Sequence, residues 1–368
     1  MTIYCSNPGA EYTAYKHEVD DAIARVLKRG QYVLGNEVAA FEEEFADWLG
    51  VTHATAVNSG TDALFLAMKA LDIGDGDEVI VPSLTATATV SAVYMSEAKP
   101  VFVDVEHGFY TVDKKAVESA ITSRTKAVIA VHLYGQVADM DALVKLCQEN
   151  NLLLIEDCAQ AHGAMYKKRY AGCMGDVGCF SFYPTKNLGA LGDAGAVVSH
   201  HSAINERISA IRQYGWNESR VAQQPGYNSR CDELQAAVLR VKLKYLESSI
   251  QARNALAEKY SHGLPGELLT TPAQRSWTRH AFHLYVIQTE QRDELNEFLK
   301  DKNIYCGVHY DKACHQMPAF EHERVSGKLR ETECLVDRIL SLPIYPQLSL
   351  AEQDKIMDAV CQFYQGNY

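Results

Sequence analysis

Short apolar runs alternate with amphipathic stretches through the first two thirds of the chain. Several of these runs are almost continuously apolar, which is typical of strands buried on both faces of a sheet. The stretches between them repeat their apolar residues at helical spacing. The pattern predicts seven strands, at residues 54–57, 78–81, 101–104, 127–131, 152–155, 179–182 and 196–199.

Two of the intervening helices are especially clear, at residues 36–49 and 61–71. Asn36 is the expected N-cap of the first helix, and Gly50 is its expected stop. Strands that alternate with helices form a mostly parallel sheet with helices on both sides. The sequence therefore predicts an α/β fold with a seven-stranded, mostly parallel sheet.

The pattern changes near residue 245. Long helices are expected at 233–246 and 251–260, followed by a loop punctuated by Pro and Gly. Beyond the loop, a smaller α/β unit is predicted, with strands at 283–289 and 305–308 and helices at 292–300, 328–340 and 350–363. We therefore predict a large domain at residues 1–247 and a small C-terminal domain at 248–368.

Composition narrows the range of partners. The 368 residues carry a formal net charge of −12, which argues against general binding to nucleic acid or membrane surfaces but leaves an anionic substrate possible. The sequence shows neither a leader pattern nor an apolar run near the roughly 20 residues of a membrane span. Its ten cysteines are scattered without a C-x-x-C pair, so reduced thiols and a cytoplasmic location are expected. No metal site is predicted, because His132, the His200–His201 pair and His280 lack partners at ligand spacing.

Three motifs follow predicted strands. Residues 58–62, NSGTD, form a strand-to-helix turn whose Gly60 and free helix N–H groups suit a phosphate, although an ordinary turn capped by Ser59 or Thr61 explains them too. The strand at 152–155 leads into Glu156 and Asp157, at the end of a parallel strand where ligands bind. A buried acid there needs a partner such as a protonated pyridine nitrogen, although a capping or ion-paired Asp explains the position too.

The third motif places Lys186 in a turn after the strand at 179–182. A desolvated lysine becomes a nucleophilic amine, whereas most loop lysines are only exposed charges. The combination is more specific than any one motif. A phosphate turn, then Asp157, then Lys186 is the order that pyridoxal-5′-phosphate (PLP) enzymes of the aspartate-aminotransferase (type I) fold require: Lys for the aldehyde, Asp for the ring nitrogen.

Longer stretches resemble the DegT/DnrJ/EryC1/StrS family of nucleotide-sugar aminotransferases over nearly the whole chain. They are GQYVLGNEVAAFEEEFA (30–46), NSGTDAL (58–64), EDCAQAHGA (156–164), GCFSFYPTKNLGALGDAGAVV (178–198), IRQYGW (211–216), YNSRCDELQAAVLRVKLKYL (227–246) and SLPIYP (341–346).

The resemblance implies a role for each matching residue. Lys186 resembles the Schiff-base lysine, which also moves the proton between substrate and cofactor. Asp157 resembles the partner of the pyridine nitrogen, and Gln160 lies where the family places a Gln or His near the ring hydroxyl. The phosphate is expected to contact Gly60, Thr61, Ser181 and, from a second subunit, Asn228, so the resemblance implies a homodimer with shared active sites.

The resemblance also implies the reaction. L-glutamate is the expected amino donor. The expected acceptor is a nucleotide-linked keto-6-deoxyhexose, with dTDP as the expected nucleotide. The motif FYPTKNLGALGDAG favours amination at C3 of the sugar over C4. Such enzymes serve amino-sugar, lipopolysaccharide O-antigen or glycoside biosynthesis.

Substrate contacts are harder to predict. The segment VHYDKACHQMP (308–318) resembles the sugar-nucleotide pocket of relatives, or is an ordinary surface loop. Candidates for the sugar are Tyr183, His309 and Tyr310. Arg212 and Arg230 are either candidates for a diphosphate or carboxylate, or surface arginines.

One position departs from the family pattern. Many relatives have an aromatic residue two positions after the Thr of P-S-x-T, stacked on the cofactor ring, but here Thr85 is followed by Ala86 and Thr87.

Two further hypotheses stay open beside the aminotransferase. A sugar dehydratase of the same fold is disfavoured because members of that group have His in place of Lys186. A non-catalytic PLP-binding regulator is disfavoured because Asp157, Gln160 and Lys186 are all intact.

Overall fold

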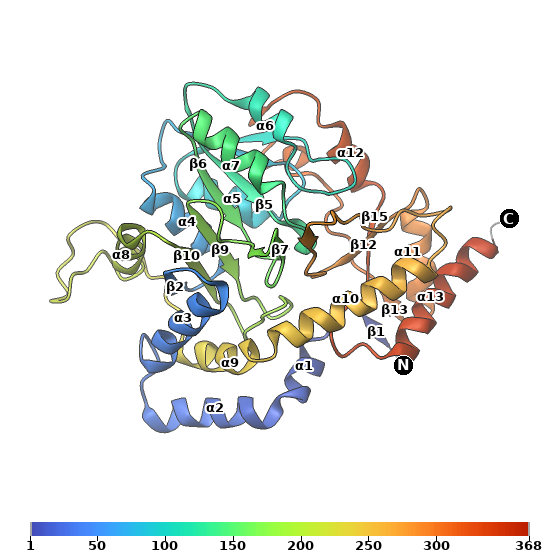
Figure 1. Cartoon of the computed structure of the whole chain (residues 1–368), viewed down its shortest axis with the longest axis horizontal. Coiled ribbons are helices and arrows are strands. Elements are labelled where there is room, and N and C mark those ends of the chain that lie inside the picture. Colours follow the sequence, from blue (N-terminus) through green and yellow to red (C-terminus); the bar gives the residue numbers. More distant parts are fainter. Residues whose placement is uncertain (1, 367–368) are drawn as a thin grey trace.

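A computed structural model describes residues 2–366, and a large twisted sheet forms its centre (Figure 1). The sheet has eight strands in the order β14-β4-β3-β5-β6-β9-β10-β2. All neighbours are parallel except β10, which is antiparallel to both β9 and β2. Their bounds are β14 (Arg324–Val325), β4 (Lys99–Val103), β3 (Glu78–Pro82), β5 (Thr125–Val131), β6 (Leu153–Asp157), β9 (Val177–Ser181), β10 (Gly195–Ser199) and β2 (His53–Val57).

The seven strands predicted from the apolar runs are confirmed, each within two residues of its predicted bounds. The eighth, β14, was not predicted because two residues carry no periodic signal. It comes from the C-terminal part of the chain and pairs with the edge strand β4, with Arg324 opposite Val101.

Helices cover both faces of the sheet because its strands are apolar on both sides. Ile80 points into one core and its neighbours Val79 and Val81 into the other. The first core holds side chains of α3 (Asn36–Leu49), α6 (Lys114–Ala120), α7 (Met140–Glu149) and α9 (Glu233–Leu243). The second holds side chains of α4 (Gly60–Ala70), α5 (Thr87–Met95), α8 (Ser202–Ile211) and α12 (Arg330–Val336).

A separate core forms at the C-terminal end of the chain. It packs α10 (Leu246–Gly263), α11 (Arg292–Asp301) and α13 (Leu350–Gln365) against a small sheet of β12 (Tyr285–Gln288) and β15 (Ile339–Leu342). Strand β1 (Ile3–Tyr4) also belongs to it and pairs with β13 (Ile304–Tyr305). Strand β1 precedes residue 247 but pairs in the C-terminal unit, and strand β14 follows residue 247 but pairs in the large sheet. The domain boundary at residue 247 stays a prediction.

The remaining elements are short or lie at the periphery. They are α1 (Pro8–Ala14), α2 (Lys16–Arg29), the 3-10 turns η1 (Leu133–Gly135) and η2 (Cys314–Gln316), and a small sheet of β7 (Met165–Tyr166), β8 (Arg169–Tyr170) and β11 (Thr278–Arg279). Helix α2 packs on α9 through a small apolar cluster.

Two local predictions were wrong. Asn36 is the first residue of α3, and the buried carboxylate of Glu233 caps that helix by accepting the N–H groups of Gly35, Glu37 and Val38. The helix expected at 328–340 ends at Val336, because the next apolar residues form strand β15.

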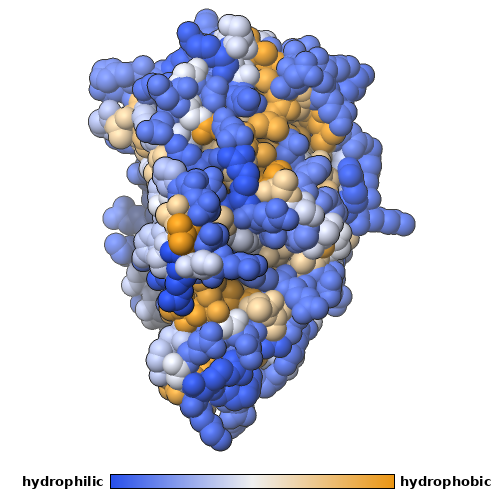
Figure 2. All heavy atoms as spheres, turned by 90° about the vertical axis from the view of Figure 1, so that its left-hand side faces the viewer, coloured by the Kyte–Doolittle hydropathy of each residue, from blue (hydrophilic) through white to orange (hydrophobic). Residues whose placement is uncertain are grey.

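The segment that follows α8 projects from the left-hand side of the molecule (Figure 1). It exposes Tyr214, Val221 and Tyr227. Figure 2 looks at this side and shows hydrophobic residues gathered on its surface. In the described part of the chain, no helix combines the length and apolar character needed to span a membrane.

Candidate active site

The turn from β2 into α4 provides a cradle at the N-terminus of a helix. Ser59 is the N-cap, and its hydroxyl accepts the N–H of Asp62 at 3.1 Å. Gly60 lies against the end of β9, where a Cβ on residue 60 would stand 2.5 Å from the Cβ of Ser181. The glycine thus lets the backbone N–H groups at the helix start approach the Ser181 hydroxyl, as a bound phosphate would need.

Asp157 ends strand β6, at the same edge of the sheet. One of its carboxylate oxygens accepts the hydroxyl of Thr89 at 2.8 Å, and the other accepts the N–H of Ala159 at 3.1 Å. Burial raises the pKa of this carboxyl, while these two hydrogen bonds and the charge of Lys186 act against the rise. A protonated pyridine nitrogen is a partner of the kind that such a buried acid needs.

Lys186 lies in the turn after β9, and several hydrogen bonds hold this turn in place. The main chain closes the turn with a bond from the N–H of Lys186 to the carbonyl of Tyr183 at 2.8 Å. Asn187 donates to the carbonyl of Ala281 at 2.9 Å, and Lys242 donates to the carbonyl of Gly189 at 2.7 Å. Burial lowers the pKa of Lys186 to about 8, against the opposing charge of Asp157, so a reactive neutral amine is accessible near neutral pH.

A single cavity of about 230 Å³ joins these features. The predicted residues that line it are Gly60, Thr61, Asp157, Gln160, Ser181, Tyr183 and Lys186. These residues follow β2, β6 and β9, whose carboxyl ends meet at one edge of the sheet. Ala86, Ala88 and Thr89 also line the cavity, so small side chains form one of its walls.

Gln160 connects the cavity to the segment predicted to bind sugar. Its carbonyl oxygen accepts the N–H of Tyr134 at 2.7 Å, and its amide nitrogen donates to the hydroxyl of Tyr310 at 3.3 Å. The Tyr134 hydroxyl in turn donates to the carbonyl of His309. Burial lowers the pKa of His309 to about 4, and its Nδ1 lies 2.9 Å from the Ser341 hydroxyl. His309 and Tyr310, two of the candidates for the sugar, therefore contact Gln160 or its partner Tyr134 and do not line the cavity.

The candidates from the projecting segment do not line the cavity of this chain. The buried guanidinium of Arg212 is paired with Glu42 and donates to the carbonyl of Ala56, and its contact with a substrate anion stays a prediction. Arg230 lies 5.9 Å from the ring centroid of Tyr214. Asn228 is exposed on the same segment.

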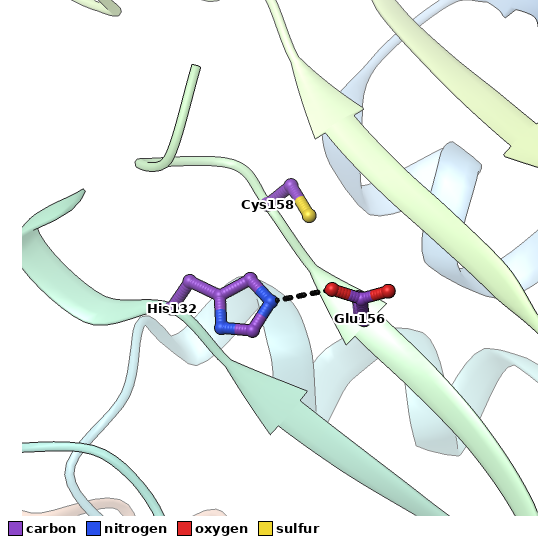
Figure 3. A group of neighbouring side chains, drawn as sticks. All are labelled: His132, Glu156 and Cys158. Atoms are coloured by element: carbon purple, nitrogen blue, oxygen red, sulfur yellow. Dashed lines mark hydrogen bonds and ion pairs between the residues drawn. The ribbon is translucent and has the colours of Figure 1, made fainter. Parts of the chain in front are cut away.

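His132, Glu156 and Cys158 lie close enough together to suggest a metal site (Figure 3). Hydrogen bonds already use the ligand atoms of His132 and Glu156, however. His132 pairs through Nε2 with Glu156 at 2.9 Å and accepts the N–H of Ala138 at Nδ1. Glu156 also accepts three N–H groups, those of Gly172, Met174 and Gly175.

The pKa values agree with this interpretation. Burial acts to raise the pKa of Glu156, but its hydrogen bonds outweigh burial and hold that pKa below its ordinary value. Burial keeps the pKa of the Cys158 thiol well above its ordinary value. The network ties the ends of β5 and β6 to the loop before β9, and it explains the cluster without a metal ion.

Sequence reasoning missed the hydroxyls of Thr85 and Thr89 beside Asp157. Alternating threonines at 85, 87 and 89 were the available signal. Which threonine faces Asp157 depends on where α5 begins, and that start has no side-chain cap to mark it.

Comparison with known proteins gives one consistent result. Residues 14–361 match the DegT/DnrJ/EryC1/StrS aminotransferase family. The dTDP-3-amino-3,4,6-trideoxy-alpha-D-glucose transaminase of Streptomyces venezuelae is 45% identical over 95% of this chain and 93% of its own. The UDP-N-acetyl-3-dehydro-alpha-D-glucosamine 3-aminotransferase of Acidithiobacillus ferrooxidans is 41% identical over 92% of both chains. The crystal structure of S. venezuelae DesV in complex with a ketimine intermediate superposes with a TM-score of 0.96, at 44% identity over 98% of both chains.

Proposed function

Because the chain belongs to the DegT/DnrJ/EryC1/StrS aminotransferase family, we propose that it transfers the amino group of L-glutamate to C3 of a dTDP-linked keto-6-deoxyhexose. The protein is an aminotransferase of the type I fold that uses PLP. The observation that carries the proposal is the meeting of Gly60, Asp157 and Lys186 in one cavity, in a chain similar to sugar transaminases over its length.

Each cavity residue has a proposed task. PLP, when bound, supplies an electron sink for cleaving bonds at the amine-bearing carbon. Lys186 would hold the cofactor through its aldehyde and, once released, would move the proton at the reacting carbon. Asp157 would bind the ring nitrogen, and Gln160, which Tyr134 holds in place, would lie near the ring hydroxyl. The N-terminus of α4 at Gly60 and Thr61, with the Ser181 hydroxyl, would bind the phosphate.

The named relatives support C3 over C4 as the position of amination. Both the S. venezuelae and the A. ferrooxidans relatives carry position 3 in their names, although one acts on a dTDP-sugar and the other on a UDP-sugar. The higher identity to the dTDP-sugar transaminase favours dTDP for this chain. Amination at C4 of the same sugar class is the second candidate.

We also propose a homodimer in which Asn228 reaches the phosphate of the partner subunit's cofactor. Three observations support it: Asn228 is exposed, its segment projects from the body, and the same side of the molecule exposes hydrophobic residues (Figure 2). A cytoplasmic location and a role in O-antigen or other glycoside biosynthesis complete the proposal.

The dimer has a direct test in mixed subunits. Lys186→Ala and Asn228→Asp proteins, each inactive alone, are refolded together. A mixed dimer contains one site with both native residues, so activity is expected to return to about a quarter of the wild-type value by statistical mixing. Activity that stays absent in confirmed mixed dimers contradicts a shared site.

The main experiment is a substrate screen with product NMR. Purified protein is expected to show a PLP absorption band that borohydride traps and Lys186→Ala abolishes. L-glutamate alone is expected to change this band, and a keto-sugar to restore it. The screen pairs 3-keto and 4-keto sugars on dTDP and UDP. Amination only at C4 would overturn the assignment of position, and a protein that binds PLP yet aminates nothing would favour the regulator.

A further inference from the structure

A chain of three buried polar groups runs from the wall of the cavity to its carboxylate. The hydroxyl of Thr89, in the first turn of α5, lies 2.8 Å from Oδ2 of Asp157. The hydroxyl of Thr85, just before the helix, lies 2.9 Å from that of Thr89. All three residues are at most 5% exposed. Water is therefore largely excluded from these bonds.

The direction of the chain follows from counting protons. An ionised carboxylate only accepts hydrogen bonds, and a threonine hydroxyl has a single proton to donate. If Asp157 is ionised, Thr89 gives its proton to Oδ2 and must accept the proton of Thr85. A protonated Asp157 that donated to Thr89 would reverse this order. Donation from Thr85 to Thr89 and from Thr89 to Asp157 is thus the arrangement that the ionised form of Asp157 requires.

We propose that Thr89, oriented by Thr85, is a positioning residue that keeps Asp157 ionised and aims its free lone pairs at the cofactor's ring nitrogen. The proposal rests on the assignment of Asp157 made above. A buried acid with few donors tends to take up a proton itself, and then it can no longer hold the proton on the ring. The N–H of Ala159 supplies a donor to Oδ1, and Thr89 supplies the corresponding donor to Oδ2.

Other groups near Asp157 do not replace this hydroxyl. Lys186 acts through its charge to lower the pKa of Asp157, against the effect of burial. The amine of Lys186 is committed to the cofactor when the aldehyde is bound. The Nε2–H of His132 is directed to Glu156. Thr89 is consequently the side-chain donor in contact with Asp157.

The test measures the protonation of the ring nitrogen directly. Wild type and variants are loaded with PLP that carries nitrogen-15 in the ring, and the ring-nitrogen chemical shift is recorded by NMR. Thr89→Val removes the hydroxyl at nearly constant shape, and Thr89→Ser retains it. Ser91→Ala, on the same helix two residues away, is the matched control. Binding of PLP and the rate of the half-reaction with L-glutamate are measured in parallel.

We expect the Thr89→Val shift to move toward the unprotonated value and the half-reaction to slow about tenfold or more, the scale of one lost hydrogen bond to a charged group. Thr89→Ser and Ser91→Ala are expected to match wild type, and Thr85→Val to change the shift in the same direction by less. A Thr89→Val shift equal to that of wild type would overturn the proposal. If Thr89→Val does not fold, an unchanged shift in Thr85→Val overturns it instead. An unprotonated ring in wild type would count against the role of Asp157 itself.

Discussion

The ammonium group of Lys242 lies 2.7 Å from a carboxylate oxygen of Glu11, in a position where the lysine side chain is only 1% exposed. The same ammonium donates to the carbonyl of Gly189, in the turn that carries Lys186. This pair therefore connects α1, α9 and the active-site turn. Removing one partner of a buried pair leaves the other charge without compensation.

Replacing Lys242 by Met is expected to destabilise the apoprotein by about 3 kcal/mol in urea unfolding, because Glu11 and the Gly189 carbonyl lose their shared donor. PLP affinity is expected to fall as well, since the Lys186 turn loosens. Lys244→Met is the control: its ammonium is 3.5 Å from Glu18 and 64% exposed, so a change under about 1 kcal/mol is expected. Equal effects at both positions would contradict a special role for the buried pair.

Replacing Gly60 by Ala tests the cradle. The added methyl group would overlap Ser181 and push α4 away from β9, so PLP is expected to bind about tenfold to a hundredfold more weakly, the scale of a forced overpacking. Fluorescence titration of apoprotein with PLP measures this. Gly74→Ala is the matched control, since its Cβ would make only an ordinary 3.5 Å contact with the Ser96 carbonyl. An unchanged affinity of Gly60→Ala for PLP would contradict the proposal that the phosphate binds at this turn.

The pH dependence of PLP capture tests the state of Lys186. Only the neutral amine attacks the aldehyde, and burial lowers the pKa of Lys186 to about 8. The rate at which apoprotein forms the borohydride-trappable bond is therefore expected to rise with pH and to level off above about 8. Stopped-flow absorbance measures it. An inflection near the ordinary lysine value of about 10.4 would show that Lys186 is not desolvated.

The cap of α3 gives a stability prediction that separates two residues. Glu233 accepts three N–H groups at the start of this helix, at 2.8, 3.0 and 2.9 Å. Glu233→Ala is expected to cost about 2 kcal/mol or more of unfolding free energy, because buried donors lose a charged acceptor. Asn36→Ala, the cap expected from sequence, is expected to change stability by less than about 0.5 kcal/mol. The opposite ranking in urea unfolding would restore Asn36 as the cap.

The sequence by itself determined the seven central strands, most of the helices around them and three residues that meet in the cavity. Apolar periodicity reports burial along a strand or helix directly, and Gly60, Asp157 and Lys186 each follow a strand whose end meets the others at one edge of a parallel sheet. Local chemistry and topology were sufficient for these features.

Only the tertiary structure decided which polar groups meet across long separations in sequence. Glu233 replaces Asn36 as a cap from 197 positions away, Arg212 pairs with Glu42 rather than facing the cavity, and Thr89 rather than a neighbouring threonine donates to Asp157. The physical reason is common to all three. A hydrogen bond or ion pair depends on distances of about 3 Å between atoms, and these distances are set by the packing of whole elements, which leaves no periodic trace in the sequence.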